Sequence, residues 1–470
     1  MRTLQKVISC GLALLMTASV SACGGAKPAQ PEAQAAPDAS AAPAASSEAP
    51  AAAGGSEKVL RIYCWNTEFQ DRFNAYFKDK LPADVSVDWV ITPNDDNAYQ
   101  NKLDTDLKNQ ASTADKIDIF LIEADYALKY VNSEYTLDVR SDVGLTDVDL
   151  KDQYKYTQEI ATDGNGKLKA VTWQATPGLL AYRRSIAKDV LGTDDPVEVQ
   201  KQVSDWDKFN AVAVKMHDKG YKMLSGYEDS YRTFSNNVSA PWVDETDTIR
   251  IDPNIMKWVE QTKEYTEKGY NNKTKLWAPE WHADQGPAGK VFGFFYSTWG
   301  INFTLLGNSL AKPLAEGGKK EVGNGIFGDY AVCEGPQNYY WGGSWICAAT
   351  GTDNVDIVRD LMKTLTCDAA TMKKITEDTE DYTNNQTAMN EIANSDYKSA
   401  FLGGQNHIAL FAKAAPNIDM SKISPYDQGL NEAFYKSFDD FYDGSVTEEE
   451  ALDNFYTASI EKYPNLKRPA

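Results

Sequence analysis

The stretch RIYCWNTEFQDRF, residues 61–73, contains the change of local structure that decides the fold. Its first residues form an apolar run that is typical of a buried β-strand. Phe69 and Phe73 then recur at the four-residue spacing that places apolar side chains on one face of a helix. Trp65 and Asn66 lie between the two patterns, where neither side chain contributes to a core. The segment therefore predicts a strand followed at once by a helix, with two ligand-like side chains at the turn.

The same alternation continues along the next fifty residues. Residues 85–91 (VSVDWVI) alternate like a strand, and residues 94–110 (NDDNAYQNKLDTDLKNQ) read as a helix capped from its first residues. Residues 116–123 (KIDIFLIE) are again apolar enough for a buried strand, and a further helix begins after residue 124. Strands and helices in this order, with short connections, predict a doubly wound parallel sheet.

Polar and aromatic side chains follow the strands of this predicted sheet. Trp65 and Asn66 follow the first strand, and Glu123 and Asp125 follow the third. Ligands of doubly wound α/β proteins bind at the carboxyl ends of the strands. We therefore expect these four side chains to face a crevice.

The rest of the chain also alternates between predicted strands and predicted helices. Residues 167–192 predict a strand, a Thr-Pro-Gly break at 176–178 that crosses between lobes, a second strand and a helix. A strand ends near residue 299, and residues 339–350 (YYWGGSWICAAT) form another. The roughly 410 residues that follow residue 57 exceed what one core usually supports, so two lobes are expected. Helices are predicted around 205–219, 254–268, 427–442 and 447–462.

The first 22 residues predict a signal peptide. Arg2 and Lys6 precede a short apolar run that cannot span a bilayer. The run ends in VSAC, which resembles a bacterial lipobox in which Cys23 is lipidated and becomes the first mature residue. An ordinary secretory signal remains the alternative. The sequence contains no later run of about 18 apolar residues, so the expected anchor is the lipid alone.

Residues 23–57 consist mainly of Ala, Pro, Ser, Gly and Gln, with no aromatic residue and no Leu, Ile or Val among residues 24–57. Such a segment cannot bury enough surface to offset its ordering entropy. It predicts a flexible linker that lifts the folded part away from the membrane.

Composition and motifs exclude several classes of function. The net charge of −21 disfavours nucleic acid and anionic lipid as partners. The chain has no zinc-like Cys or His spacing, no HExxH, no GxSxG and no phosphate-binding loop, so no metal, no cofactor and no catalysis are expected. One disulfide remains possible, with its pairing open, among Cys64, Cys333, Cys347 and Cys367.

From about residue 58 to its end, the chain resembles the extracellular solute-binding proteins of ABC importers, in the group that takes sugars and oligosaccharides. The resemblance rests on the lipobox and linker and on the order of several segments along the chain. These are RIYCWNTEF at 61–69, IDIFLIEADYALKY at 117–130, TPGLLAYRRSIAKDVLG at 176–192, GKVFGFFYSTWG at 289–300 and GGSWICAATGTDN at 342–354.

The resemblance implies a fold of the type II periplasmic-binding-protein kind, with two doubly wound α/β lobes joined by three crossings. By this analogy the first lobe takes residues 58–175 with 337–384, and the second takes 176–336 with 385–470. A monomer, anchored on the outer face of the cytoplasmic membrane, would close its lobes over a sugar and deliver it to the permease subunits of the importer.

A sugar offers an apolar C–H face and a rim of hydroxyl groups, which aromatic rings and hydrogen-bonding side chains respectively recognise. Further candidates for the cleft are Trp277, Trp281 and Trp341. A peptide, polyamine or organic anion as the solute remains an alternative, and so does a surface glycosidase or a polysaccharide-anchoring lipoprotein. The predicted ligand-binding residues are Trp65, Asn66, Glu68, Glu123, Asp125, Trp173, Tyr182, Arg183, Trp242, Trp299 and Trp345.

Overall fold

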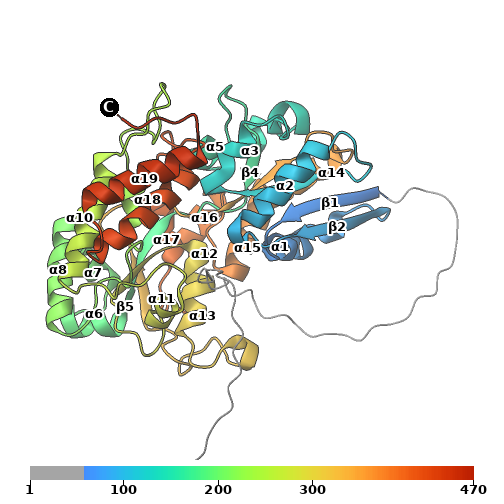
Figure 1. Cartoon of the computed structure of the whole chain (residues 1–470). Coiled ribbons are helices and arrows are strands. Elements are labelled where there is room, and N and C mark those ends of the chain that lie inside the picture. The colour runs from blue at the N-terminus through green and yellow to red at the C-terminus, as the bar shows by residue number, and fades with distance from the viewer. Residues whose placement is uncertain (1–57, 470) are drawn as a thin grey trace, which may run out of the picture. The chain divides into compact units, whose positions relative to one another are not determined.

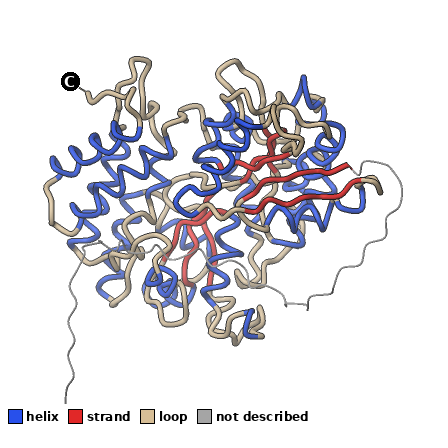
Figure 2. The backbone as a smooth tube through the Cα atoms, turned by 45° about the vertical axis from the view of Figure 1, so that its right-hand side comes forward, coloured by secondary structure: helices blue, strands red, loops and turns tan. Residues whose placement is uncertain are grey.

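The computed structural model describes residues 58–469, and their strands form two separate sheets (Figures 1 and 2). The signal peptide, Cys23 and the linker predicted before residue 58 lie outside the described residues. The first sheet has five strands in the order β2-β1-β3-β8-β4. These strands are β1 (Lys58–Cys64), β2 (Val85–Ile91), β3 (Ile119–Glu123), β4 (Ala170–Thr172) and β8 (Ser344–Ala348).

The first sheet begins as the strand–helix alternation predicts. β1 pairs in parallel with β2 and with β3, so that all three end at the same edge. β8 lies between β3 and β4 and is antiparallel to both. Because β8 follows β4 by about 170 residues, the chain leaves the first sheet and later returns to it.

The second sheet has three strands in the order β6-β5-β7, and both pairings are antiparallel. Every residue of the three strands is buried, which accounts for their continuous apolar sequences. The strands are β5 (Gly178–Arg183), β6 (Gly293–Ser297) and β7 (Tyr330–Cys333).

Helices cover both sheets, and their ends follow capping chemistry that the sequence shows. Asp195 and Asp252 each accept backbone N–H groups at the start of a helix whose next residue is proline. Thr447 and Glu450 form a capping box. In the first part of the chain the helices are α1 (Glu68–Tyr76), α2 (Ala98–Asn109), α3 (Ala127–Val131), α4 (Asp147–Leu150), α5 (Lys155–Ile160), α6 (Arg184–Leu191), α7 (Pro196–Gln202) and α8 (Trp206–Asp218). Those that follow are α11 (Pro279–Asp284), α12 (Thr298–Gly300), α13 (Leu306–Ser309), α14 (Val355–Thr366), α15 (Ala369–Thr379), α16 (Gln386–Ala393) and α17 (His407–Ala414).

Four helices form a second core of their own. We call α9 (Tyr231–Ser235), α10 (Pro253–Glu267), α18 (Asp427–Tyr442) and α19 (Glu448–Lys462) the helical cluster; Figure 1 shows α18 and α19 in red beside α10. Its core is rich in aromatic rings, such as Tyr231 packed 4.7 Å from Trp258 between ring centroids. Large aromatic side chains bury much apolar surface per residue and hold such a small bundle together.

Three connecting segments lie side by side where the chain passes between the sheets. They join β4 to β5, β7 to β8, and α15 to α16, and bridges link Gln174 to Thr383 and Pro177 to Tyr340. The first segment contains the Thr-Pro-Gly break predicted as a crossing. Each segment carries backbone in the left-handed region, which is costly for residues other than glycine and is common in hinges and functional sites. These residues are Thr176 (φ 31°), Gly335 (φ 73°), Gly342 (φ 72°), Gly343 (φ 109°) and Glu380 (φ 59°).

Candidate functional site

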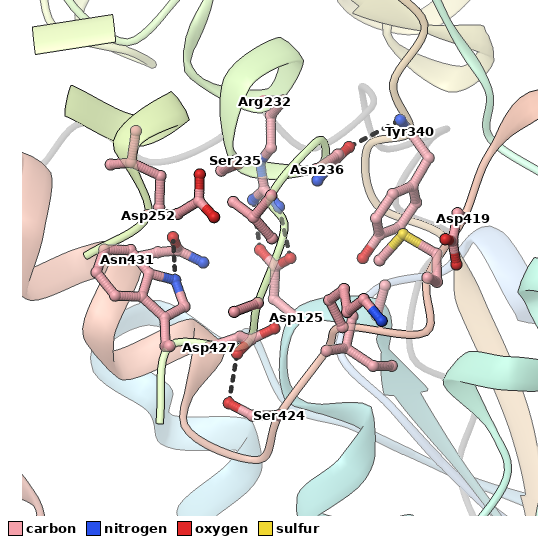
Figure 3. A pocket seen from close by; sticks show the side chains of 18 of the residues that line it. Asp125, Arg232, Ser235, Asn236, Asp252, Tyr340, Asp419, Ser424, Asp427 and Asn431 are labelled. Atoms are coloured by element: carbon pink, nitrogen blue, oxygen red, sulfur yellow. Dashed lines mark hydrogen bonds and ion pairs between the residues drawn. The ribbon is translucent and has the colours of Figure 1, made fainter. Parts of the chain in front are cut away.

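A cavity lies where the carboxyl end of β3 meets the helical cluster (Figure 3). Its free volume is about 40 Å³, which holds a few water molecules. Small-molecule sites in proteins usually measure about 300–1,000 Å³, so the walls must move apart before a larger solute fits. The walls include Asp125, Arg232, Asn236, Trp242, Tyr340, Asp427 and Asn431.

An ion pair crosses the middle of the cavity. Asp125 belongs to the 3-10 helix η3 (Ala124–Tyr126) that follows β3, and Arg232 belongs to α9 of the helical cluster. Nη1 of Arg232 donates to Oδ1 of Asp125 at 2.6 Å, and Nη2 donates to Oδ2. The side chains retain only 19% and 24% of their exposure, so this two-pronged bond is largely shielded from water.

Two further carboxyl groups beside this pair have raised pKa values. Glu123 accepts the backbone N–H of Asp125 at 2.9 Å. Burial and the negative charge of Asp125 raise the pKa of Glu123 to about 8, although Arg232 partly offsets both. Burial likewise raises the pKa of Asp427 to about 7, even though its Oδ1 accepts a hydrogen bond from the Ser424 hydroxyl at 2.5 Å.

Three tryptophans form an aromatic group next to the ion pair. Trp299 stacks on Trp277 with 6.0 Å between ring centroids, and its indole N–H donates to the carbonyl of Trp341. The guanidinium carbon of Arg232 lies 5.9 Å from the centroid of Trp341, within cation–π range. Trp277 adopts φ 69°, a backbone conformation that is strained for a bulky residue, and strain of this kind clusters at functional sites.

The side chains at the end of β1 are placed differently from one another. Trp65 is half-buried and packs edge-on against Tyr99 at 5.5 Å, while Asn66 is exposed and accepts the backbone N–H of Glu68. Glu68 accepts a hydrogen bond from Gln174 at 2.9 Å, and burial raises the pKa of Glu68 to about 7. None of these three residues lines the cavity.

Four of the predicted ligand-binding residues are buried in the cores, and most of their polar groups have hydrogen-bond or ion-pair partners there. The indole N–H of Trp345 donates to the carbonyl of Thr157, and the Tyr182 hydroxyl donates to the carbonyl of Asp194. Arg183 pairs with Asp329 at 2.9 Å, and Trp173 stacks on Phe69. Residues Trp173, Tyr182 and Trp345 are at most 1% exposed and Arg183 is 6% exposed.

The cavity thus brings together two of the predicted ligand-binding residues, Asp125 and Trp242, with residues that the sequence did not indicate as ligand-binding. The indole N–H of Trp242 donates to Asn431 at 3.2 Å. Arg232, Tyr340 and Asp427 lie far from Asp125 in sequence and follow no strand of the first sheet. Their only signal in sequence is a polar or aromatic residue in a helix or a loop, which is common at any protein surface.

Three further properties of the described residues concern cysteines, metal binding and membrane crossing. Cys64, Cys333, Cys347 and Cys367 are all free thiols. Between residues 58 and 469 no group of three His, Cys, Asp or Glu side chains is arranged to hold a metal ion. Over the same residues, no helix combines the length and apolar character that a membrane crossing requires.

Comparison with known proteins identifies the family to which the chain belongs. The family model of bacterial extracellular solute-binding proteins matches residues 71–420, so the chain belongs to this family. A search of curated proteins gave no significant match.

Solved structures share the fold. The chain superposes on a crystal structure described as an extracellular solute-binding protein of family 1 with a TM-score of 0.70 and 16% identity, covering 86% of this chain and 99% of that one. For the ABC-transporter-associated binding protein of B. animalis subsp. lactis in complex with β-1,6-galactobiose, the TM-score is 0.63, with 16% identity over 88% and 100% of the two chains. For the sugar-binding protein MalE of Xanthomonas citri, the TM-score is 0.64, with 11% identity, covering 86% of this chain and 98% of that one. The predicted α/β fold of the periplasmic-binding-protein kind is therefore confirmed. The second sheet differs from the doubly wound sheet expected for the second lobe, because both of its strand pairings are antiparallel.

Proposed function

We propose that this protein captures a sugar or oligosaccharide between its two α/β halves and delivers it to the permease of an ABC importer. The observation that carries the proposal is the composition of the cavity and its border. Asp125 from one half faces Arg232 from the other, with Trp341 against the guanidinium. Carboxylate, guanidinium and indole are the groups that bind hydroxyl rims and C–H faces of sugars.

The structural neighbours support a sugar as the solute. One was solved in complex with β-1,6-galactobiose and another, from Bifidobacterium longum, with lacto-N-biose. In this proposal the first half takes residues 58–175 with 337–384 and the second takes 176–336 with 385–470. The three connecting segments, with their left-handed residues, act as the hinge. The chain makes and breaks no bond, works as a monomer, and is held at the membrane through lipidated Cys23.

Isothermal titration calorimetry with a panel of mono- and oligosaccharides tests the proposal. Micromolar affinity for at least one sugar is the expected result, which corresponds to about −8 kcal/mol. The same sugar, incubated with the protein and assayed for new reducing ends, should remain intact. Turnover would identify a surface glycosidase instead.

A polyamine is the second candidate, because the carboxyl groups of Asp125 and Asp427 both line the cavity. A bound ammonium group would lower the raised pKa of Asp427 and pair with the carboxylate that forms. Titration with spermidine and putrescine belongs in the same panel. Heat with these amines and none with any sugar would replace the sugar by a polyamine.

A further inference from the structure

The Asp125–Arg232 pair is a two-pronged ion pair inside the cavity, and each partner belongs to a separately packed part of the molecule. Asp125 follows β3, which lies between β1 and β8 in the first sheet. Arg232 lies between Tyr231 and Phe234, both of which are buried in the helical cluster. Figure 3 shows the two side chains pointing at one another from opposite walls.

The geometry of the pair makes it selective for one arrangement of the two walls. A guanidinium and a carboxylate bind through two parallel hydrogen bonds only when their planes align. Both Nη atoms of Arg232 reach Asp125, one at 2.6 Å. The backbone N–H of Asp125 is fixed to Glu123, and the aromatic face of Trp341 lies beside the guanidinium. A small separation of the walls therefore breaks both bonds at once.

We propose that Asp125 and Arg232 form a latch that holds the two walls of the cavity together and that a solute must open in order to bind. The open state is then a minor population, and the apparent dissociation constant is the intrinsic constant divided by the open fraction. A latch that leaves one molecule in ten open would weaken apparent binding tenfold. This effect on affinity rests on the proposed function, whereas the latch itself does not.

Hydrogen–deuterium exchange of the full-length protein, without any solute, tests the latch. The variants are Arg232→Gln, which keeps the hydrogen-bonding end but removes the charge, and Arg232→Lys, which keeps the charge but removes the two-pronged geometry. We expect amides of residues 124–131 and 231–236 to exchange at least tenfold faster in Arg232→Gln than in the wild type, with Arg232→Lys between them. Amides of α14, remote from the cavity, should exchange at wild-type rates.

Matched controls separate a latch from a general loss of stability. Lys462→Gln removes an ion pair with Glu432 that lies wholly within the helical cluster, and it should leave exchange around the cavity unchanged. Wild-type exchange rates in Arg232→Gln, or equal acceleration at α14, would overturn the latch. Failure of every sugar in calorimetry would refute only the proposed function, because no solute enters this experiment.

Discussion

Glu123 shows how one buried carboxyl group makes the protein sensitive to pH. Its folded-state pKa of about 8 lies well above the ordinary value of 4.5, because burial and the charge of Asp125 disfavour the ionised form. The neutral group contributes stability that is fully present below about pH 4.5 and is lost as the pH rises through about 8. Between these limits the unfolded chain has released a proton that the folded protein retains.

Replacing Glu123 by Gln should remove this dependence. The free energy of unfolding of the variant, relative to the wild type, should rise by up to about 1.4 kcal/mol for each pH unit between pH 5 and 8. Urea denaturation at several pH values measures it, with the exposed Glu449→Gln as the control that should follow the wild type. Parallel curves for the wild type and Glu123→Gln would show that folding does not raise the pKa of Glu123.

Trp299 joins the aromatic group to the connecting segment between β7 and β8, since its indole N–H donates to the Trp341 carbonyl. If this group stacks on the solute, Trp299→Ala should weaken sugar binding about tenfold or more, equivalent to ~1.4 kcal/mol. Trp299→Phe keeps a stacking face and should retain most of the affinity. Calorimetry with the sugar found in the panel distinguishes the two variants, and equal affinities of the alanine variant and the wild type would remove Trp299 from the site.

At the scale of elements, the connecting segments depend on close backbone approach. Gly342 adopts φ 72°, and a Cβ atom there would lie 2.9 Å from Nε1 of Trp299. Alanine at this position would combine backbone strain with displacement of the indole. The glycine is therefore required by geometry at a point where hinge and aromatic group meet.

Gly342→Ala should lower the free energy of unfolding by about 1–3 kcal/mol and should also weaken sugar binding. Gly444→Ala is the matched control, since Gly444 has φ 78° with no atom within 4 Å of a Cβ placed there. Its substitution introduces strain alone. Thermal denaturation and calorimetry of both variants separate the two effects. If the Gly444 variant lost as much affinity as the Gly342 variant, contact with Trp299 would not explain the loss.

At the scale of the whole molecule, the sequence predicted the elements well because their periodicity is local. β2 and β3 and the helices α8, α10, α18 and α19 lie within a few residues of their predicted ranges. The strand-end rule is also local, and the structure places Asp125, which this rule selects, in the wall of the cavity. Arg232 could not be found in this way, because its partner is 107 residues distant and only the packing of α9 brings them together. The sequence does not show where the side chains of Trp345 and Tyr182 point. Their strands are buried on both faces, so no alternation of polar and apolar residues distinguishes one face from the other.

The proposed attachment of the whole molecule to the membrane rests on chemistry that the sequence alone supplies. If Cys23 carries the lipid, the several acyl chains of a bacterial lipoprotein give stable anchoring, whereas a single chain binds only marginally. Cell fractionation should find the wild type with the membranes and Cys23→Ser in the soluble fraction. Cys10→Ser, which alters a cysteine inside the predicted signal peptide, should fractionate like the wild type. Because the net charge of −21 disfavours binding to anionic headgroups, a membrane-bound Cys23→Ser variant would point to an uncleaved signal peptide or a protein partner as the anchor.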